Sequence, residues 1–442
     1  MKRRPLGWLL AGLAAASLSV SAQVKDEVQR FTLKNGMEVM VLEDHSIPNA
    51  NMYLFWKVGS RNERPGITGL SHFFEHMMFN GAEKYGPKQF DRVMEAAGGA
   101  NNAYTTENVT VYTDWFPAAS LETIFDLEAD RIAKLDINPE MVESERGVVA
   151  SERTTGLENS NWRTLSEEVK GAAFRAHPYS WPVIGHESDI KAWRLEDLVQ
   201  YHRTYYAPNN ALVVVAGDVQ LDEVKRLAKA YFEPIPAQEP PLPVVTVEPE
   251  QKGERRVYVQ KASVSSPNIM VAYHVPASSD ADTPALDMLG TVLTQGRSAR
   301  LKKRLVDELQ LATDVMAYLP ESFDPNLLYF YAVARPGVDA EQLEKALLAE
   351  LKAVRERGVT AEELDKAKSL KLMSFYSQLE TINGKANAIG TYELFYGDYR
   401  KLYTAGEDFA RVSVDDIKRV AGKYLLKKNR TVGILDAKED KE

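Results

Sequence analysis

The sequence predicts an α+β protein built from two homologous α/β sandwich domains, each with helices covering an antiparallel or mixed sheet. Three observations predict this fold class. A helix pattern followed by an apolar strand pattern occurs twice, a proline-rich stretch separates the two copies, and strand patterns precede runs of helix patterns. Strands followed by a run of helices are typical of α+β folds, in which the helices pack on the sheets.

The N-terminus has the layout of an export signal. Three basic residues at positions 2–4 precede an apolar run over 6–20, and small residues end the run at Ala22. This layout predicts a cleavable secretory signal peptide over residues 1–22, and the alternative is a retained N-terminal anchor. No lipid-bearing Cys follows the signal, because the chain contains no Cys. We therefore expect an exported bacterial protein, periplasmic or secreted.

The composition excludes several classes of protein. Cleavage after Ala22 would remove three basic residues and no acidic ones, which shifts the net charge from −9 to −12. An acidic chain is a poor partner for nucleic acid, whose phosphates need clustered Lys and Arg. Without Cys, thiol catalysis is excluded, and stability must come from the core that 44% hydrophobic residues can build. No later apolar run is long enough for an integral membrane span.

The first half of the chain carries strand and helix signals in a definite order. An Asn35-Gly36 turn between two apolar runs predicts a β-hairpin, while Asn80-Gly81 and Gly98-Gly99 mark the ends of helices. The predicted strands cover 29–33, 37–42, 51–58, 101–106 and 109–116, and the predicted helices cover 67–78, 87–98, 118–135 and 139–174.

A proline-rich stretch at 233–252 marks the clearest domain boundary, because its proline density excludes regular helix and central strand. On its two sides the same residues recur 219 positions apart, such as Asp197 with Asp416 and Asn210 with Asn429. This internal repeat predicts two copies of one domain. The chain is therefore divided into a signal peptide (1–22), a first domain (23–232), a linker (233–252) and a second homologous domain (253–442).

The chemistry of the first domain lies in Ser71-His72-Phe73-Phe74-Glu75-His76. On a helix, His72 and His76 project from the same face one turn apart, so both imidazoles can bind one metal ion. Glu75 flanks that face, from which its carboxylate can reach a metal-bound water. This H-x-x-E-H order is that of the inverted zincins. The alternative is chance packing of two histidines, but the full pattern arises at random in under about one in a hundred such chains.

A catalytic zinc site needs a third protein ligand and keeps one position for water. The helix that starts at Pro139 carries Glu143, Glu145 and Glu152, the last two of which lie seven residues apart on one face. Spacing alone leaves all three glutamates open as the ligand. A purely structural zinc site would need a fourth protein ligand, and the sequence offers no Cys and no suitably spaced His for it.

Several longer segments resemble the insulinase/pitrilysin family of zinc metallopeptidases, which includes the mitochondrial processing peptidase with its zinc-binding beta subunit. The resemblance covers nearly all of the mature chain. It rests on GLSHFFEHMMFNGAEKY (69–85), GGANNAYTTENVTVYTDWFP (98–117), ERGVVASERTTGLEN (145–159), HPYSWPVIGHESDI (177–190) and YYAPNNALVVVAGDV (205–219). It implies one zinc per chain held by His72, His76 and Glu152, with Glu145 as the supporting residue and Glu75 as the general base.

The resemblance also implies a fold and a substrate class. A family chain of this length is half of a clamshell, in which two pairs of α/β domains enclose peptides or unfolded polypeptides. The expected reaction is metalloendopeptidase hydrolysis in the cell envelope. Asn102, Ala103 and Tyr104 resemble the family's edge strand beside the metal, onto which the substrate backbone adds as an extra strand.

The second domain carries no H-x-x-E-H and departs from the family pattern at one further place. Family members that complete their own chamber carry an Arg and a Tyr that orient the substrate, where this chain has Val306 and Thr313. The departure implies a heterodimer with a homologous chain that lacks the zinc motif but carries the Arg and Tyr. Arg297 or Arg300 could instead serve a homodimer. A non-catalytic chaperone or scaffold subunit of the same fold is the alternative function.

Overall fold

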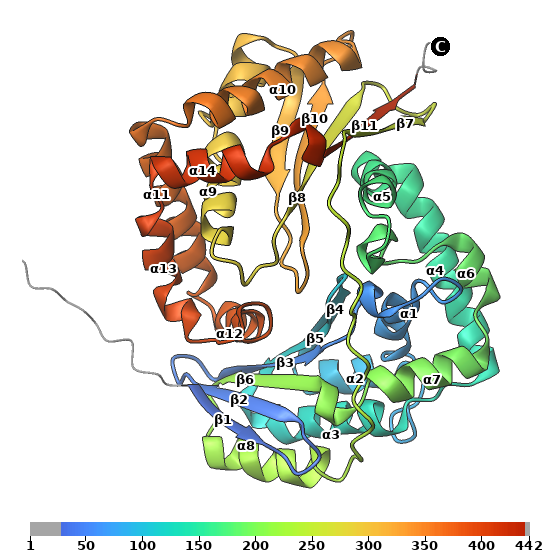
Figure 1. The fold of residues 1–442 in the computed structure, drawn as a ribbon. Coiled ribbons are helices and arrows are strands. Elements are labelled where there is room, and N and C mark those ends of the chain that lie inside the picture. Colours follow the sequence, from blue (N-terminus) through green and yellow to red (C-terminus); the bar gives the residue numbers. More distant parts are fainter. Residues whose placement is uncertain (1–27, 438–442) are drawn as a thin grey trace, which may run out of the picture.

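The computed structural model describes residues 28–437, and each of its two domains is built on one β-sheet (Figure 1). Both sheets are mixed and covered by helices, so the predicted fold class is confirmed. The predicted signal peptide, residues 1–22, lies outside the described residues. Within residues 28–437, no helix combines the length and the apolar character that a membrane crossing requires.

The first sheet has the strand order β1-β2-β6-β3-β5-β4, with β2 and β6 parallel and the other neighbours antiparallel. The central strands β3 and β6 are almost wholly buried, whereas the edge strand β4 alternates between exposed and half-buried residues. The predicted hairpin is confirmed as the β1–β2 pair. The strands are β1 (Val28–Thr32), β2 (Glu38–Glu43), β3 (Asn49–Trp56), β4 (Ala100–Thr105), β5 (Thr110–Pro117) and β6 (Ala211–Gly217).

Except for α5, the helices of the first domain pack on one face of this sheet and form a single apolar core with it. The helices predicted over 67–78, 87–98 and 118–135 begin and end within three residues of those positions. The helices are α1 (Leu70–Met77), α2 (Gln89–Ala96), α3 (Leu121–Lys134), α4 (Pro139–Asn159), α5 (Asn161–Ala173), α6 (Glu187–Ala192), α7 (Leu195–Tyr205) and α8 (Leu221–Leu227).

The second sheet has the order β7-β11-β8-β10-β9, with β7 and β11 parallel, which repeats the β2-β6-β3-β5-β4 part of the first sheet. Its strands are β7 (Arg255–Gln260), β8 (Asn268–Val275), β9 (Ala312–Tyr318), β10 (Asn326–Ala334) and β11 (Arg430–Asp436). The helices of this domain are α9 (Thr283–Thr294), α10 (Ala340–Arg357), α11 (Ala361–Gln378), α12 (Ile382–Tyr396), α13 (Lys401–Arg411) and α14 (Val414–Tyr424).

The repeat found in the sequence is also a repeat of structure. Helices α7 and α14 and strands β6 and β11 occupy positions 219 residues apart. In the first copy the Asn210 amide donates a hydrogen bond to the carbonyl oxygen of Tyr205, and in the second the Asn429 amide does the same to Tyr424, at 2.8 Å in both. This shared turn explains why Tyr and Asn recur at the same spacing.

The single helix predicted over 139–174 is wrong, because the chain breaks at Ser160 between α4 and α5. Ser160 has extended backbone angles, and its hydroxyl accepts a hydrogen bond from the N–H of Arg163 at 3.2 Å. This is the N-cap arrangement that serine favours. The helical pattern continues on both sides of Ser160, so periodicity alone does not reveal the break.

Each sheet is covered on its second face by a helix that belongs to the other domain (Figure 1). Helix α5 packs on β7, β8 and β11, where Leu165 and Val169 join an apolar cluster of the second sheet. Helix α12 packs on β3 and β6, where Ala386 and Ile389 join a cluster of the first sheet. The domains therefore share two apolar interfaces, and separating them would expose both.

We expect Gly390→Ala to lower the free energy of unfolding by about 1–3 kcal/mol through overpacking, although Ala is the better helix former. Gly390 in α12 lies against β3, and a Cβ there would come within 2.1 Å of the Phe55 ring. Thermal unfolding of the chain measures the effect. Gly422→Ala in α14 is the control, because nothing lies within 4 Å of its Cβ position. Equal melting temperatures in the two variants would contradict the close contact.

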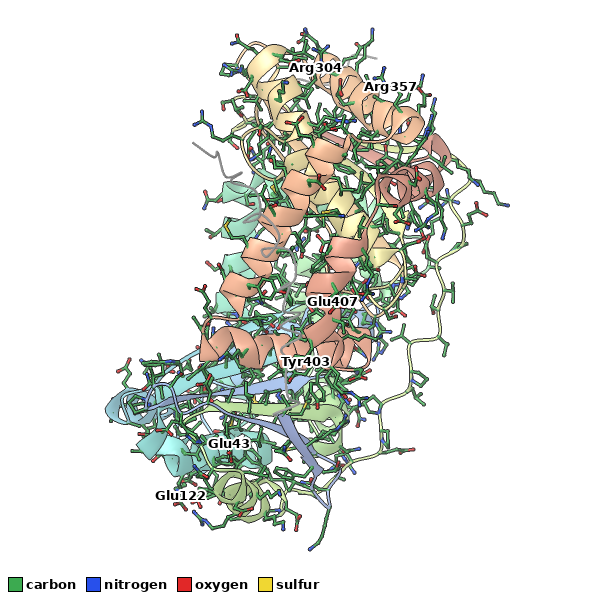
Figure 2. All side chains as sticks on the ribbon, turned by 90° about the vertical axis from the view of Figure 1, so that its left-hand side faces the viewer. Glu43, Glu122, Arg304, Arg357, Tyr403 and Glu407 are labelled. Carbon is green, nitrogen blue, oxygen red and sulfur yellow. The ribbon has the colours of Figure 1, made fainter. Side chains whose placement is uncertain are left out.

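The proline-rich linker runs in extended form along the edge of the molecule beside both domains (Figure 2). Residues 236–254 contain no helix or strand. The linker is attached to the first domain through Glu248, whose carboxylate accepts hydrogen bonds from the backbone N–H groups of Arg175, Ala176 and His177.

Candidate metal centre

Helix α1 is held at its N-terminus by a buried glutamate. The N-cap residue, Gly69, has φ 93° and no side chain with which to cap the helix. The Glu63 carboxyl group accepts hydrogen bonds from the N–H groups of Gly69 at 2.7 Å and Ser71 at 2.8 Å. These are two of the donors that a helix start leaves without an intrahelical partner. Glu63 therefore fixes the first turn of α1, directly before the H-x-x-E-H segment.

The apolar face of α1 sets the direction of its polar face. The fully buried residues on the apolar face are Leu70, Phe73, Phe74 and Met77. His72, Glu75 and His76 are only partly buried on the opposite side of the helix. Core packing therefore turns the two histidines and the glutamate towards α4 and β4, the elements that contact α1 there.

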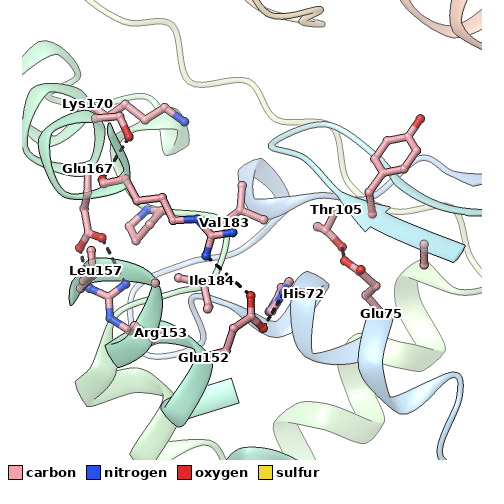
Figure 3. Close-up of a pocket in the computed structure, with 16 residues that line it drawn as sticks. His72, Glu75, Thr105, Glu152, Arg153, Leu157, Glu167, Lys170, Val183 and Ile184 are labelled. Carbon is pink, nitrogen blue, oxygen red and sulfur yellow. Dashed lines mark hydrogen bonds and ion pairs between the residues drawn. The ribbon is translucent and has the colours of Figure 1, made fainter. Parts of the chain in front are cut away.

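Three ligand atoms converge between α1 and α4. The Nε2 atoms of His72 and His76 lie 3.5 Å and 3.4 Å from the same oxygen, Oε2 of Glu152, and the three atoms lie within 4.8 Å of one another. Ligand atoms bound at about 2.0–2.2 Å to a tetrahedral zinc ion lie about 3.3–3.6 Å apart. The donor types and spacing therefore fit zinc. Figure 3 shows two of the three side chains, those of His72 and Glu152.

Glu145 lies behind His76, on the side of the imidazole ring away from Glu152. Its Oε1 is 2.8 Å from Nδ1 of His76, and its Oε2 accepts a hydrogen bond from the Asn80 amide at 2.5 Å. Orientation of a ligand imidazole through its second nitrogen is typical of metal sites. Glu145 thus leaves Nε2 of His76 free to face Glu152.

Glu75 lies on the side of α1 that faces the edge strand β4. Its Oε2 accepts a hydrogen bond from the Thr105 hydroxyl at 2.6 Å (Figure 3). Burial raises the pKa of Glu75, an effect that the hydrogen bond from Thr105 partly offsets. The carboxylate is therefore held beside the histidines without belonging to the converging ligand group.

The electrostatics of the centre favour a cation. Burial lowers the pKa of His72 to about 4. For His76, burial also acts to lower the pKa, but Glu145 and Glu152 outweigh it and raise the pKa to about 9. The hydrogen bond from His76 lowers the pKa of Glu152. Two carboxylates thus stabilise positive charge at this place, which a metal ion would supply when bound.

A cavity of about 410 Å³ opens beside these residues. It is lined by His72, Glu75 and Glu152 and, on the edge strand, by Ala103 and Tyr104. Asn102, which was predicted to contact substrate, does not line the cavity, and its side-chain oxygen accepts a hydrogen bond from the N–H of Ala103. Glu143, the third candidate ligand, pairs with Arg146 instead, and 77% of its side chain is exposed.

Three residues near the centre were not singled out from the sequence. Asn80 lies beyond the end of α1, in the Asn80-Gly81 turn, so helix periodicity does not indicate its contact with Glu145. Thr105 lies in a strand whose neighbours were named, but the strand pattern does not show which side chain meets Glu75. Arg163 lies 3.8 Å from Glu152 across the α4–α5 break, and no sequence signal indicates this contact.

Two family models match consecutive parts of the chain. The model described as Insulinase (Peptidase family M16) matches residues 38–187, which include the whole candidate metal centre. The model described as Peptidase M16 inactive domain matches residues 192–371, where no H-x-x-E-H occurs.

Similar proteins extend the match to nearly the full length. The zinc protease PqqE of Helicobacter pylori is 33% identical over 425 residues, covering 94% of this chain and 94% of that protein. A solved protease structure from Helicobacter pylori has a TM-score of 0.89 at 32% identity, covering 92% of this chain and 99% of that one. The periplasmic protease PqqL from Escherichia coli shares the fold, with a TM-score of 0.76 at 21% identity, over 93% of this chain and 48% of PqqL.

The predicted resemblance is therefore confirmed, and the names of these relatives support a peptidase that depends on zinc. Because family models match parts of both halves and a relative at 33% identity covers 94% of this chain, this chain belongs to the insulinase family, peptidase family M16.

Proposed function

We propose that this chain is a zinc-dependent metalloendopeptidase that hydrolyses peptides or unfolded polypeptides in the cell envelope. His72, His76 and Glu152 hold one zinc ion, Glu145 orients His76, and Glu75 is the general base. The observation that carries the proposal is the convergence of three zinc-type donors within 4.8 Å at a cavity bordered by an edge strand. The names of relatives as zinc proteases support it.

The proposed mechanism assigns the proton transfers to Glu75. When bound, zinc supplies Lewis-acid polarisation of the scissile carbonyl and lowers the pKa of water towards neutrality. Glu75 accepts a proton from the attacking water and delivers it to the leaving amine. Thr105 holds Oε2 of Glu75, so the other carboxylate oxygen can take the proton. The raised pKa of Glu75 suits a group that must act as base and then as acid.

The edge strand β4 is the proposed docking site for the substrate backbone. It pairs with β5 on one side only, which leaves its other side open to an added strand. Ala103 and Thr105 lie on the half-buried side of the strand, and Thr105 contacts Glu75. A peptide bound along Asn102, Ala103 and Tyr104 would therefore pass directly beside the general base. Main-chain pairing would accept varied sequences in extended form.

Glu145→Ala should weaken zinc binding by about 10- to 100-fold, because His76 would lose the partner of its Nδ1 atom. Competition with a chelator of known affinity measures the change. Glu143→Ala is the control, since Glu143 lies on the same helix but pairs only with Arg146 among the described residues. Unchanged zinc affinity in Glu145→Ala would remove Glu145 from the supporting role.

A second chain is the proposed partner. This chain matches about half of PqqL, which supports a complete enzyme made of two such domain pairs. Val306 packs against the second-domain core and Thr313 is an exposed residue of β9, so neither offers a charged donor. The Arg300 guanidinium is bound to Glu363 at 2.7 Å, which argues against its use in a homodimer. A heterodimer with a homologous chain that carries the Arg and Tyr remains our proposal.

The test of the proposed function is to purify the mature chain, measure its metal content and assay an unstructured peptide. We expect about one zinc per chain, as for a site with three protein ligands, and hydrolysis that a chelator abolishes. The assay is run with the chain alone and with a homologous partner chain. Full turnover by the isolated chain would contradict the heterodimer. Zinc binding without hydrolysis in either form would favour the alternative, a non-catalytic chaperone or scaffold.

The site of action is proposed from the N-terminal pattern. Residues 1–22 have the features of a cleavable export signal, which would place the mature protein in the periplasm or outside the cell. N-terminal sequencing of the protein isolated from its native cells tests cleavage after Ala22.

A further inference from the structure

The wall of the cavity opposite β4 is formed by helix α5. Its lining residues are Arg163, Ser166, Glu167 and Lys170, which lie on one face of the helix at spacings of three, four and seven residues. Arg153 of α4 lies beside them. The wall thus carries three cations, Arg153, Arg163 and Lys170. They differ in how closely each is paired with a carboxylate of the chain.

Two of these cations are already neutralised by carboxylates of the chain. The Arg153 guanidinium donates two hydrogen bonds to Glu167, at 2.6 Å and 3.2 Å, and 10% of its side chain is exposed. Lys170 forms an ion pair with Glu107, and 17% of its side chain is exposed. Because each of these two cations is paired with a carboxylate of the chain, neither is available to bind a charged ligand.

Arg163 is different. Its side chain is 57% exposed, and its contact with a carboxylate among the described residues is the 3.8 Å approach to Oε1 of Glu152. Glu152 is one of the converging candidate ligands, so a bound metal ion would partly neutralise the carboxylate that Arg163 approaches. The guanidinium then keeps its donors for another acceptor, and Arg presents five N–H groups in a fixed fork.

The guanidinium of Arg163 packs against Gly156 of α4. A Cβ at position 156 would lie 2.6 Å from Nη1, 3.6 Å from Cδ and 3.7 Å from Cζ of Arg163. Glycine in the middle of a helix is unfavourable for helix stability. Here its missing side chain leaves room for Nη1 of Arg163 against α4, next to the candidate metal centre. The guanidinium therefore lies against α4 and within 3.8 Å of Glu152.

We propose that Arg163 binds a carboxylate of the substrate close to the scissile bond. This inference rests on the proposed peptidase function. A peptide docked on β4 runs along the cavity between Glu75 and α5, so a substrate group near the cleaved bond can reach Arg163. The carboxylate belongs either to an acidic side chain or to the C-terminus of a short peptide, and both offer the acceptor pair that an Arg fork matches.

The experiment compares variants of one unstructured peptide whose cleavage site has been mapped. One pair, with amidated ends, carries Glu or Gln next to the cleaved bond. A second pair carries Gln there and ends in a free or an amidated C-terminus shortly after it. In the wild-type protein, with its partner chain where turnover needs it, we expect kcat/KM to favour the carboxylate member of one pair by about 10- to 100-fold. The favoured pair identifies the source of the carboxylate.

Four variants separate recognition by Arg163 from a general effect on folding. Arg163→Gln should bring the ratio for the favoured pair to about one, and Arg163→Lys should restore part of it, because Lys keeps the charge but not the fork. Gly156→Ala should reduce the ratio with Arg163 still present, because the new Cβ displaces the flexible end of the side chain. Gly147→Ala, also in α4, is its control, since nothing lies within 4 Å of its Cβ position.

A binding assay makes the result independent of turnover. The same peptides are titrated into zinc-loaded Glu75→Gln protein, and the ratio of their Kd values is compared with and without Arg163→Gln. A preference in Kd that depends on Arg163, together with no hydrolysis by the wild type, would defeat the peptidase proposal and leave Arg163 only as a binding site for a peptide carboxylate. A ratio of about one for both pairs in the wild type would overturn it, as would a preference that survives in Arg163→Gln.

Discussion

Glu75→Gln should lower kcat for peptide hydrolysis by about 100- to 10,000-fold, the contribution typical of a general base. The amide has nearly the same shape and its oxygen can still accept the hydrogen bond from Thr105, but it cannot take a proton from water. Because Glu75 lies outside the group of converging ligand atoms, the variant should bind as much zinc as the wild type. Steady-state kinetics at saturating peptide, with metal analysis of the same sample, measures both quantities.

Glu143→Gln is the matched control for this experiment. Glu143 is also a helical glutamate of the first domain, but its exposed side chain pairs with Arg146 away from the cavity. Its kcat should equal that of the wild type. Full activity in Glu75→Gln would exclude the proposed mechanism even if zinc binding were established.

His72→Ala, His76→Ala and Glu152→Ala should each lose zinc and reduce hydrolysis to background. Each substitution removes one of three donors that lie within 4.8 Å of one another, and two donors are too few for a catalytic zinc site. The fold should survive, because the apolar face of α1 and the core around it do not involve these side chains. Metal analysis, peptide hydrolysis and far-UV circular dichroism of each variant test the three parts of this expectation.

Metal affinities of three glutamate variants test the choice of Glu152 as the third ligand. Glu143→Ala should keep wild-type zinc affinity, and Glu145→Ala should show a weaker but measurable affinity. If Glu152→Ala retained the affinity of the wild type while Glu145→Ala or Glu143→Ala lost zinc, Glu152 would not be the ligand.

Much of the fold could be predicted because the relevant signals are local. The Asn35-Gly36 hairpin, the helix after Pro139 and the repeated turn with Asn210 and Asn429 depend on residues close in the chain, where turn chemistry and periodicity act directly. The break at Ser160 was missed for the converse reason. A serine cap inside a continuous helical pattern has no effect on the period, and only the packing of α5 on the second sheet decides that the chain must turn there.

Part of the candidate site was equally local. His72, Glu75 and His76 lie within five residues on one helix, so their common face follows from helical geometry alone. Glu152 was one of three glutamates until the resemblance to the family selected it, because a separation of 76 residues carries no geometric information. The structure places its Oε2 3.5 Å and 3.4 Å from the two Nε2 atoms, a relation that depends on how α4 packs on α1.

By itself, the sequence determined the two-domain α/β architecture, the helix that carries the candidate metal ligands, and the family. The tertiary structure alone decided that α5 and α12 each cover the sheet of the other domain, and that Arg163 lies beside Glu152. Along one continuous helix the backbones of these two residues would be about 16 Å apart along the axis, whereas after the turn at Ser160 the Arg163 guanidinium lies 3.8 Å from the Glu152 carboxylate. Helix periodicity describes which residues share a face, whereas contacts between elements depend on the burial of apolar surface far along the chain.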